Sequence, residues 1–123
     1  MKVHHKHFHL ARRKMGHIID EVYTTLLHYG SGEVDLRIVR EADGMRMFAK
    51  SDFDPDYLEE IERMGELLQP AVRSPAIVEM FWELAGEDPY TGESKLSLIG
   101  QMADDVAFTI GDQNVSIEIY IAY

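Results

Sequence analysis

The chain is 123 residues long, contains no cysteine and carries a net charge of −10, and 46% of its residues are hydrophobic. This length and composition are typical of one globular domain, and they exclude a disordered chain, disulfides and cysteine-based zinc sites. Five Lys or Arg and no acid lie within residues 1–14, so the charge divides into +5 and −15, and the acidic body argues against nucleic acid as a partner.

The sequence also bears on location and surface. No apolar run approaches the roughly 20 residues that span a membrane, and the basic start is not followed by a signal-peptide core. We therefore expect a cytoplasmic protein with a single domain, residues 1–123, and no membrane contact. Its acidity has two interpretations, a well-solvated surface or an interface for a basic protein.

The first segment, residues 2–10 (KVHHKHFHL), alternates in a way that predicts a His-rich first strand. His5, His7 and His9 would lie on one side of it, where imidazoles can bind zinc, nickel or copper. A closed metal site needs four ligands, however, and no second ligand cluster stands out in the sequence. Plain surface histidines are the alternative interpretation.

Residues 10–69 predict a helix, two strands and a second helix. Apolar residues recur three or four positions apart in residues 10–29, as on one buried helix face, and residues 33–40 then alternate with a period of two. Asp43-Gly44 predicts a tight turn into a strand at 45–50, and Asp54-Pro55 predicts the start of a helix that Pro70 stops. The apolar residues that we expect to point inward after the first helix are Val34, Leu36, Ile38, Leu58, Ile61, Met64 and Leu68.

The second half of the chain predicts two further helices and a closing hairpin. A helix over 74–86 is apolar nearly all round, so it is either fully packed or a dimer or partner face that exposes Phe81 or Trp82. After the turn-rich residues 87–93, Ser94 is expected to cap a helix that runs through Val106. A turn at 111–114 then joins two strands. The expected architecture is an α/β (α+β) two-layer sandwich, with helices on one face of a mixed, mostly antiparallel sheet.

Two stretches of this sequence resemble a known family. The run EVYTTLLHYGSGEVDLRIVREADGMRMFAKSDFDPDYL is similar to the middle of the GHKL ATP-binding domains, which have a histidine-kinase-like (Bergerat) fold. The anti-sigma-factor serine kinase branch is the most similar, with its pattern E-x-x-x-N-x-x-x-H-G followed by two strands. LSLIGQMADDVAFTIGDQNVSIEIYIAY is similar to the closing helix and hairpin of that branch.

The resemblance implies roles for several residues and also marks where they depart from the family. The position of Glu21 holds the catalytic base, and the position of Thr25 holds an Asn that binds magnesium. Asp52 is the stand-in for an adenine-binding Asp, without the glycines that normally follow. Residues 87–94 fall in the lid, and Lys95 and Ser97 stand where a Gly-x-Gly-Leu holds phosphates.

Three hypotheses follow. The first is a degenerate GHKL-fold bacterial regulatory protein that binds a protein, such as a sigma factor or an anti-sigma antagonist, and has lost ATP and every other cofactor; it could form a homodimer. The second is an active ATP- and magnesium-dependent serine kinase with Glu21 as base, and with Thr25, Asp52, Lys95 and Ser97 at the nucleotide. The third is metal binding through His5, His7 and His9.

Overall fold

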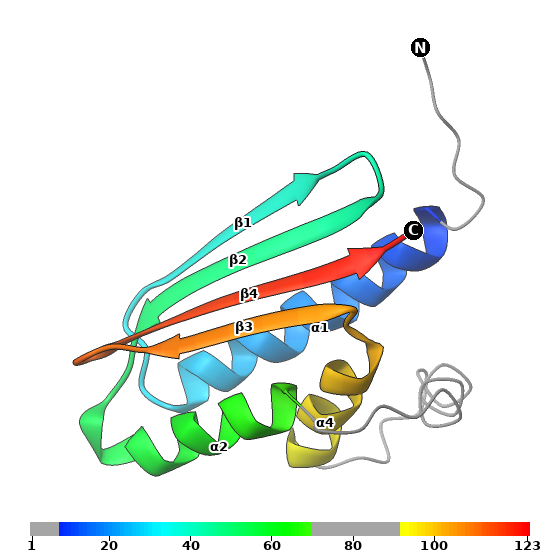
Figure 1. Cartoon of the computed structure of the whole chain (residues 1–123). Coiled ribbons are helices and arrows are strands. Elements are labelled where there is room, and N and C mark those ends of the chain that lie inside the picture. Colours follow the sequence, from blue (N-terminus) through cyan, green and yellow to red (C-terminus); the bar gives the residue numbers. More distant parts are fainter. Residues whose placement is uncertain (1–7, 70–91) are drawn as a thin grey trace.

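The computed structural model describes residues 8–69 and 92–123, which form a two-layer α+β sandwich (Figure 1). The elements, in order, are α1 (Phe8–His28), β1 (Val34–Arg40), β2 (Gly44–Asp52), the 3-10 helix η1 (Pro55–Tyr57), α2 (Leu58–Leu68), α4 (Gly92–Met102), β3 (Asp105–Ile110) and β4 (Asn114–Ala122). The four strands form one sheet in the order β1-β2-β4-β3, and each neighbouring pair is antiparallel. The predicted fold class is confirmed, and the sheet of the described residues is entirely antiparallel.

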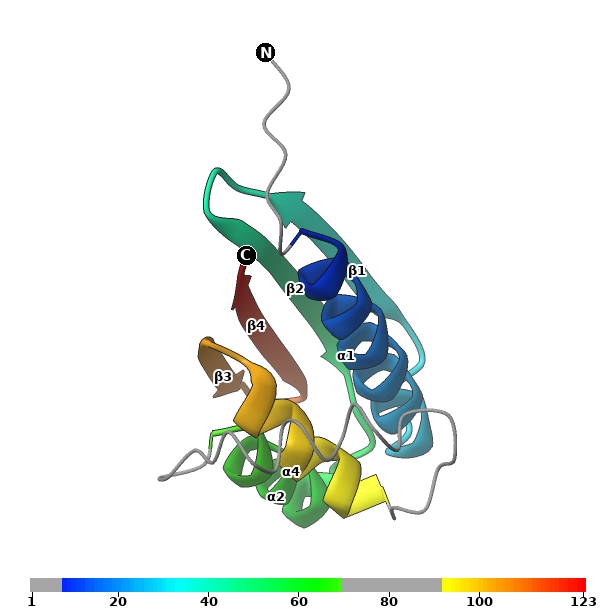
Figure 2. The same ribbon diagram turned by 90° about the vertical axis from the view of Figure 1, so that its right-hand side faces the viewer.

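The core lies between the sheet and the three helices, which cover the same face (Figure 2). Strands β2 and β4 supply its centre, because every second side chain of each points toward the helices and is buried. Met47, Ile119 and Ile121 have no exposed surface at all. In the part of the chain that the structure describes, no helix is both long and apolar enough to cross a bilayer.

Helix α1 buries one face and ends where the sequence predicts. Its fully buried side chains lie at the expected spacing: Ala11, Met15, Ile18, Val22 and Leu26. At its end Gly30 has φ +87°, while the Ser31 and Gly30 amides donate to the Leu26 and Leu27 carbonyls, each at 3.1 Å. These two hydrogen bonds together form the Schellman motif. The motif requires a residue with a left-handed backbone conformation, which Gly30 supplies.

Strand β1 is the exposed edge of the sheet. Val34, Leu36 and Ile38 pair directly with the buried residues Ser51, Ala49 and Met47, so their side chains point to the helix side as predicted. Leu36 and Ile38 nevertheless stay 39% and 40% exposed. The predicted inward direction is confirmed, but it does not bury these two side chains, because an edge strand has a neighbouring strand on one side only.

The β1–β2 turn and the start of α2 follow the predicted chemistry with small shifts. Glu41 N–H donates to the Gly44 carbonyl (2.8 Å), so Ala42 and Asp43 form the turn and Gly44 begins β2. Asp54 caps η1 by accepting from the Asp56 amide (2.9 Å). In α2 the residues Ile61, Met64 and Leu68 are buried as expected, whereas Leu58 is 43% exposed, which corrects its prediction.

Other corrections concern the ends of elements. Phe8, His9 and Leu10 belong to α1 and not to a strand, because the helical pattern begins before the alternating one ends. Helix α4 already includes residues 92–94, so Ser94 does not cap it, and the last three residues of the predicted 87–94 loop are helical. The same helix ends at Met102, and Val106 lies in β3. The predicted helix over 74–86, with Phe81 and Trp82, lies outside the described residues.

Candidate functional site

Glu21 and Thr25 lie one turn apart on the same side of α1. Both side chains are half-buried. In Figure 2 α1 runs downward in front of the sheet, with β1 to its right and α4 to its left. The helical spacing places Glu21 and Thr25 on one side of the buried stripe of α1, and Tyr23 and Leu27 on the other. The structure therefore keeps the predicted base and the predicted magnesium ligand together on one side.

Lys95 and Ser97 lie in α4, the helix that contacts α1. Both are half-buried. Because α4 begins at Gly92, Ser97 lies beyond the first turn, and its amide belongs to the helical hydrogen-bond ladder. The free amides of a helix N-terminus are the groups that hold a phosphate, so Ser97 cannot offer its own amide in that way.

Asp52 is separated from these four residues by the sheet. Side chains alternate along β2, so Asp52 points to the face opposite the buried Ser51, which is the face that the helices leave open. Its Oδ1 accepts hydrogen bonds from the backbone amides of Gly32 (2.9 Å) and Glu33 (3.2 Å). The carboxylate thus fixes the loop between α1 and β1, and it does not converge with Glu21 and Thr25.

The Ser31 hydroxyl completes this junction from the covered side. It donates to the Asp52 carbonyl (2.6 Å) and lies 3.2 Å from the Ser51 hydroxyl, so two buried polar side chains satisfy each other. The bond from the Asp54 amide to the Tyr29 carbonyl (3.2 Å) ties the same region to the end of α1. These bonds make the end of β2 a structural joint.

The predicted metal ligands are not assembled in the described part of the chain. His9 is exposed on α1, and His5 and His7 lie outside the described residues. Within residues 8–69 and 92–123, no group of three or more His, Asp or Glu side chains is placed to hold a metal ion. The metal-binding hypothesis therefore stays a prediction.

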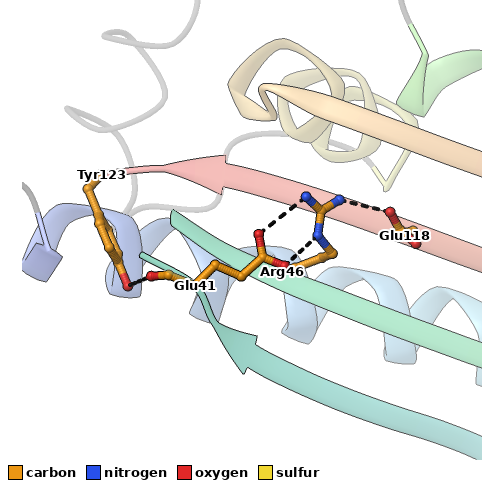
Figure 3. A network of polar contacts seen from close by, with 4 residues as sticks. All are labelled: Glu41, Arg46, Glu118 and Tyr123. Atoms are coloured by element: carbon orange, nitrogen blue, oxygen red, sulfur yellow. Dashed lines mark hydrogen bonds and ion pairs between the residues drawn. The ribbon is translucent and has the colours of Figure 1, made fainter. Parts of the chain in front are cut away.

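A charged network crosses the open face of the sheet (Figure 3). Arg46 of β2 donates from Nε to Glu41 (2.9 Å) and from a terminal nitrogen to Glu118 of β4 (2.8 Å). The Tyr123 hydroxyl donates to the Glu41 carbonyl (3.2 Å). The two carboxylates raise the pKa of Arg46, so it stays charged, and the network joins the β1–β2 turn to β4.

Tyr120 lies beside this network, with the Arg46 guanidinium 4.7 Å from its ring centre. Burial of the phenol and its hydrogen bond with Asp43 raise the pKa of Tyr120 to about 12. The phenol therefore stays protonated to a higher pH than an ordinary tyrosine.

A shallow depression of about 570 Å³ lies at the opposite end of the open face. Charged side chains dominate it, with Glu33, Asp35 and Asp52 set against Lys50. Its volume is within the range of ligand sites, but such sites are normally enclosed and mostly apolar. This depression has neither property, so it does not favour a small-molecule site.

The feature that the sequence did not predict is an exposed apolar surface, which we call the β1 patch: Tyr23 and Leu27 of α1, and Leu36 and Ile38 of β1. Their exposed fractions run from 36% for Tyr23 to 52% for Leu27. Leu36 and Ile38 point to the helix side of the sheet, and α1 packs against β1. The alternating pattern of β1 was visible in the sequence, but its place at the sheet edge was not.

Comparison of the chain with models of protein families, with curated proteins and with solved structures gave no match.

Proposed function

We propose that this protein is a bacterial regulatory module of the GHKL type that acts by binding another protein and has lost ATP. The order helix, strand, strand, helix and then helix, strand, strand agrees with the resemblance in the sequence. One observation supports the loss of ATP binding. The Asp52 carboxylate, the stand-in for the adenine-binding group, is bonded to two backbone amides on the face away from Glu21 and Thr25.

The partner that fits best is a basic protein surface, such as that of a sigma factor or an anti-sigma antagonist. The exposed side of η1 and α2 carries Asp56, Glu59, Glu60, Glu62 and Glu66, and Arg63 is paired with Glu66 (3.2 Å). An acidic face of this kind speeds and orients the encounter with a basic one. Reversal of Glu59 and Glu66 to Lys should therefore slow association, with Asp20→Lys on the exposed side of α1 as the control.

The first experiment is isothermal titration of the folded protein with ATP and with ADP, in the presence of magnesium. We expect no binding heat at millimolar nucleotide. Nucleotide binding that the Thr25→Ala substitution weakens would overturn the proposal. Glu21→Ala is the second variant, because loss of a catalytic base alone should leave nucleotide binding intact, whereas loss of a magnesium ligand should weaken it. Interaction with purified sigma factors and anti-sigma antagonists, measured by the same method, tests the protein-binding half.

The second candidate is an active serine kinase, and one observation favours it. Glu21 and Thr25 are half-buried on α1, and α1 contacts α4, the helix that carries Lys95 and Ser97. A base, a hydroxyl and a cation on facing helices are components that phosphoryl transfer can use. This candidate requires magnesium-dependent nucleotide binding in the titration, followed by transfer of phosphate to a protein serine.

A further inference from the structure

Among the described strands, β1 lies at one edge of the sheet and pairs with β2 alone. The Glu41 to Gly44 hydrogen bond sets the pattern of the β1–β2 ladder, in which hydrogen-bonded and non-bonded pairs alternate. Val39, Arg37 and Asp35 therefore form the hydrogen-bonded pairs with their partners in β2. The N–H and C=O groups of Val34, Leu36 and Ile38 point away from β2, and none of them has a hydrogen-bond partner among the described residues.

The other edge of the same sheet is protected. By the same alternation, the Val106 carbonyl of β3 points outward, and Gln69 at the end of α2 donates to it from Nε2 (3.1 Å). Helix α2 also packs against β3, and Phe108 fits against Gly65. Folded proteins usually block the edges of their sheets, so a seven-residue edge with exposed Leu36 and Ile38 calls for a partner strand.

We propose that the partner is β1 of a second copy of this chain, paired antiparallel about a two-fold axis at Leu36. In this register Leu36 faces Leu36 of the second copy, and Val34 faces Ile38, all on the helix side. On the open face Asp35 faces Arg37, and the symmetry makes this pair twice. Strand β1 is thus complementary to itself in charge, in polarity and in the direction of its free backbone groups.

Other registers of the same type do not have this complementarity. An axis at Arg37 places Arg37 against Arg37 of the second copy, and an axis at Asp35 places two aspartates together. An axis at Ile38 sets Asp35 against Glu41. Each creates like-charge pairs that oppose association. Of these four axes, the one at Leu36 pairs Asp35 with Arg37 and creates no like-charge pair.

The same axis brings the β1 patch of each copy toward the other. Because α1 packs against β1, the two α1 helices would lie on the same face of the joined sheets. Apolar surface that is half exposed in one copy would then be covered by its counterpart. Backbone pairing with an apolar centre and a charged outer face is typical of a specific interface.

Cysteine cross-linking tests the register directly, because the chain has no cysteine of its own. In the proposed pairing the two Leu36 Cα atoms are about 5.5 Å apart, within the range that a disulfide bridges. Leu36→Cys should therefore cross-link to a dimer under mild oxidation. Ile38→Cys is the matched control, because its counterpart lies four residues along the strand, about 14 Å away.

A mixture of Val34→Cys and Ile38→Cys proteins should cross-link although neither does so alone. Cross-linking of Leu36→Cys and Ile38→Cys at equal rates would indicate random collision and overturn the register.

Sedimentation equilibrium of charge variants tests the association itself. Asp35→Arg or Arg37→Asp creates two like-charge pairs, and each should weaken the dimer by roughly tenfold or more. An equal mixture of the two variants restores opposite charges at every pair and should form a heterodimer of near wild-type affinity. This rescue cannot come from a change in monomer folding, since each chain still carries its own substitution.

Leu36→Lys should also give a monomer, because a charge at this position blocks an edge. Leu58→Lys, at a similarly exposed site on α2, is its control and should leave the dimer intact. A wild-type protein that stays monomeric at every concentration up to millimolar would overturn the proposal. A dimer that none of the β1 substitutions weakens would overturn it as well. Neither result depends on whether nucleotide or a sigma factor binds.

Discussion

At the scale of single residues, the glycines show how close packing selects a side chain. A Cβ at Gly44 would lie 2.5 Å from the Ile121 carbonyl and from the Tyr120 hydroxyl, so this glycine is needed for the approach of β4 and not for its φ angle. A Cβ at Gly65 would lie 2.6 Å from the Phe108 ring. Gly16, in contrast, has no neighbouring atom within 4 Å. The same residue type therefore carries opposite consequences at different sites.

Substitution of two helical glycines should separate these effects. Gly16→Ala should stabilise the protein by about 1 kcal/mol, because alanine favours a helix and meets no atom there. Gly65→Ala should destabilise it by about 1–3 kcal/mol, because Phe108 must move in a packed core. Urea unfolding measures both free energies. Stabilisation by Gly65→Ala would show that the Phe108 ring is free to shift.

The raised pKa of Tyr120 predicts a pH dependence of stability. Its pKa is about 12 in the folded protein against about 10 when unfolded, so its contribution to stability is complete below pH 10 and is lost as the pH rises toward 12. The free energy of unfolding should fall more steeply over this range in the wild type than in Tyr120→Phe. Equal slopes in the two proteins would contradict the assignment.

At the scale of elements, local sequence predicted most of the helices and strands, since their periodicity is set by the chain itself. The errors lie where two signals compete or meet. The alternating residues 2–10 hid the start of α1 at Phe8, and Ser94 resembled a helix cap although α4 begins at Gly92. The candidate site was predicted less well. Glu21 and Thr25 share a helix and must lie together, whereas the placement of Asp52 depends on which face of β2 is covered.

The Arg46 network predicts a coupling between elements that are distant in sequence. Arg46→Ala should lower the free energy of unfolding by about 1–2 kcal/mol, a modest value because its side chain and its two partners are 24–39% exposed. A double-mutant cycle with Glu118→Ala should give a coupling energy of about 0.5–1 kcal/mol that decreases in high salt. A cycle between Arg63 and Glu66, exposed by 57% and 69%, should give less.

At the scale of the whole molecule, stability is concentrated in the two central strands. Strands β2 and β4 are bonded on both sides and carry the fully buried residues Met47, Ile119 and Ile121. Methionine supplies much of the rest, with Met15, Met45, Met64 and Met102 also buried. This flexible side chain fills irregular gaps, so a core of this composition tolerates changes of shape.

Hydrogen exchange should reflect this distribution. The amides of β2 and β4 should exchange most slowly, at rates set by global unfolding, and the outward amides of Leu36 and Ile38 should exchange fastest within the sheet at high dilution. If two copies pair through β1, protection of these two amides should rise with protein concentration. Equal protection of the amides in all four strands at high dilution would contradict the conclusion that stability is concentrated in the central strands β2 and β4.

The sequence by itself determined the fold class, the order of the elements and the inward face of α1 and β4, because hydrophobic periodicity and turn chemistry act over a few residues. Only the tertiary structure decided which strands lie at the edges of the sheet and which face the described helices cover. These properties depend on how distant strands pair. The pairing leaves Leu36 and Ile38 exposed, removes Asp52 from the side of Glu21 and Thr25, and gives β1 the form of a surface that can pair with its own copy.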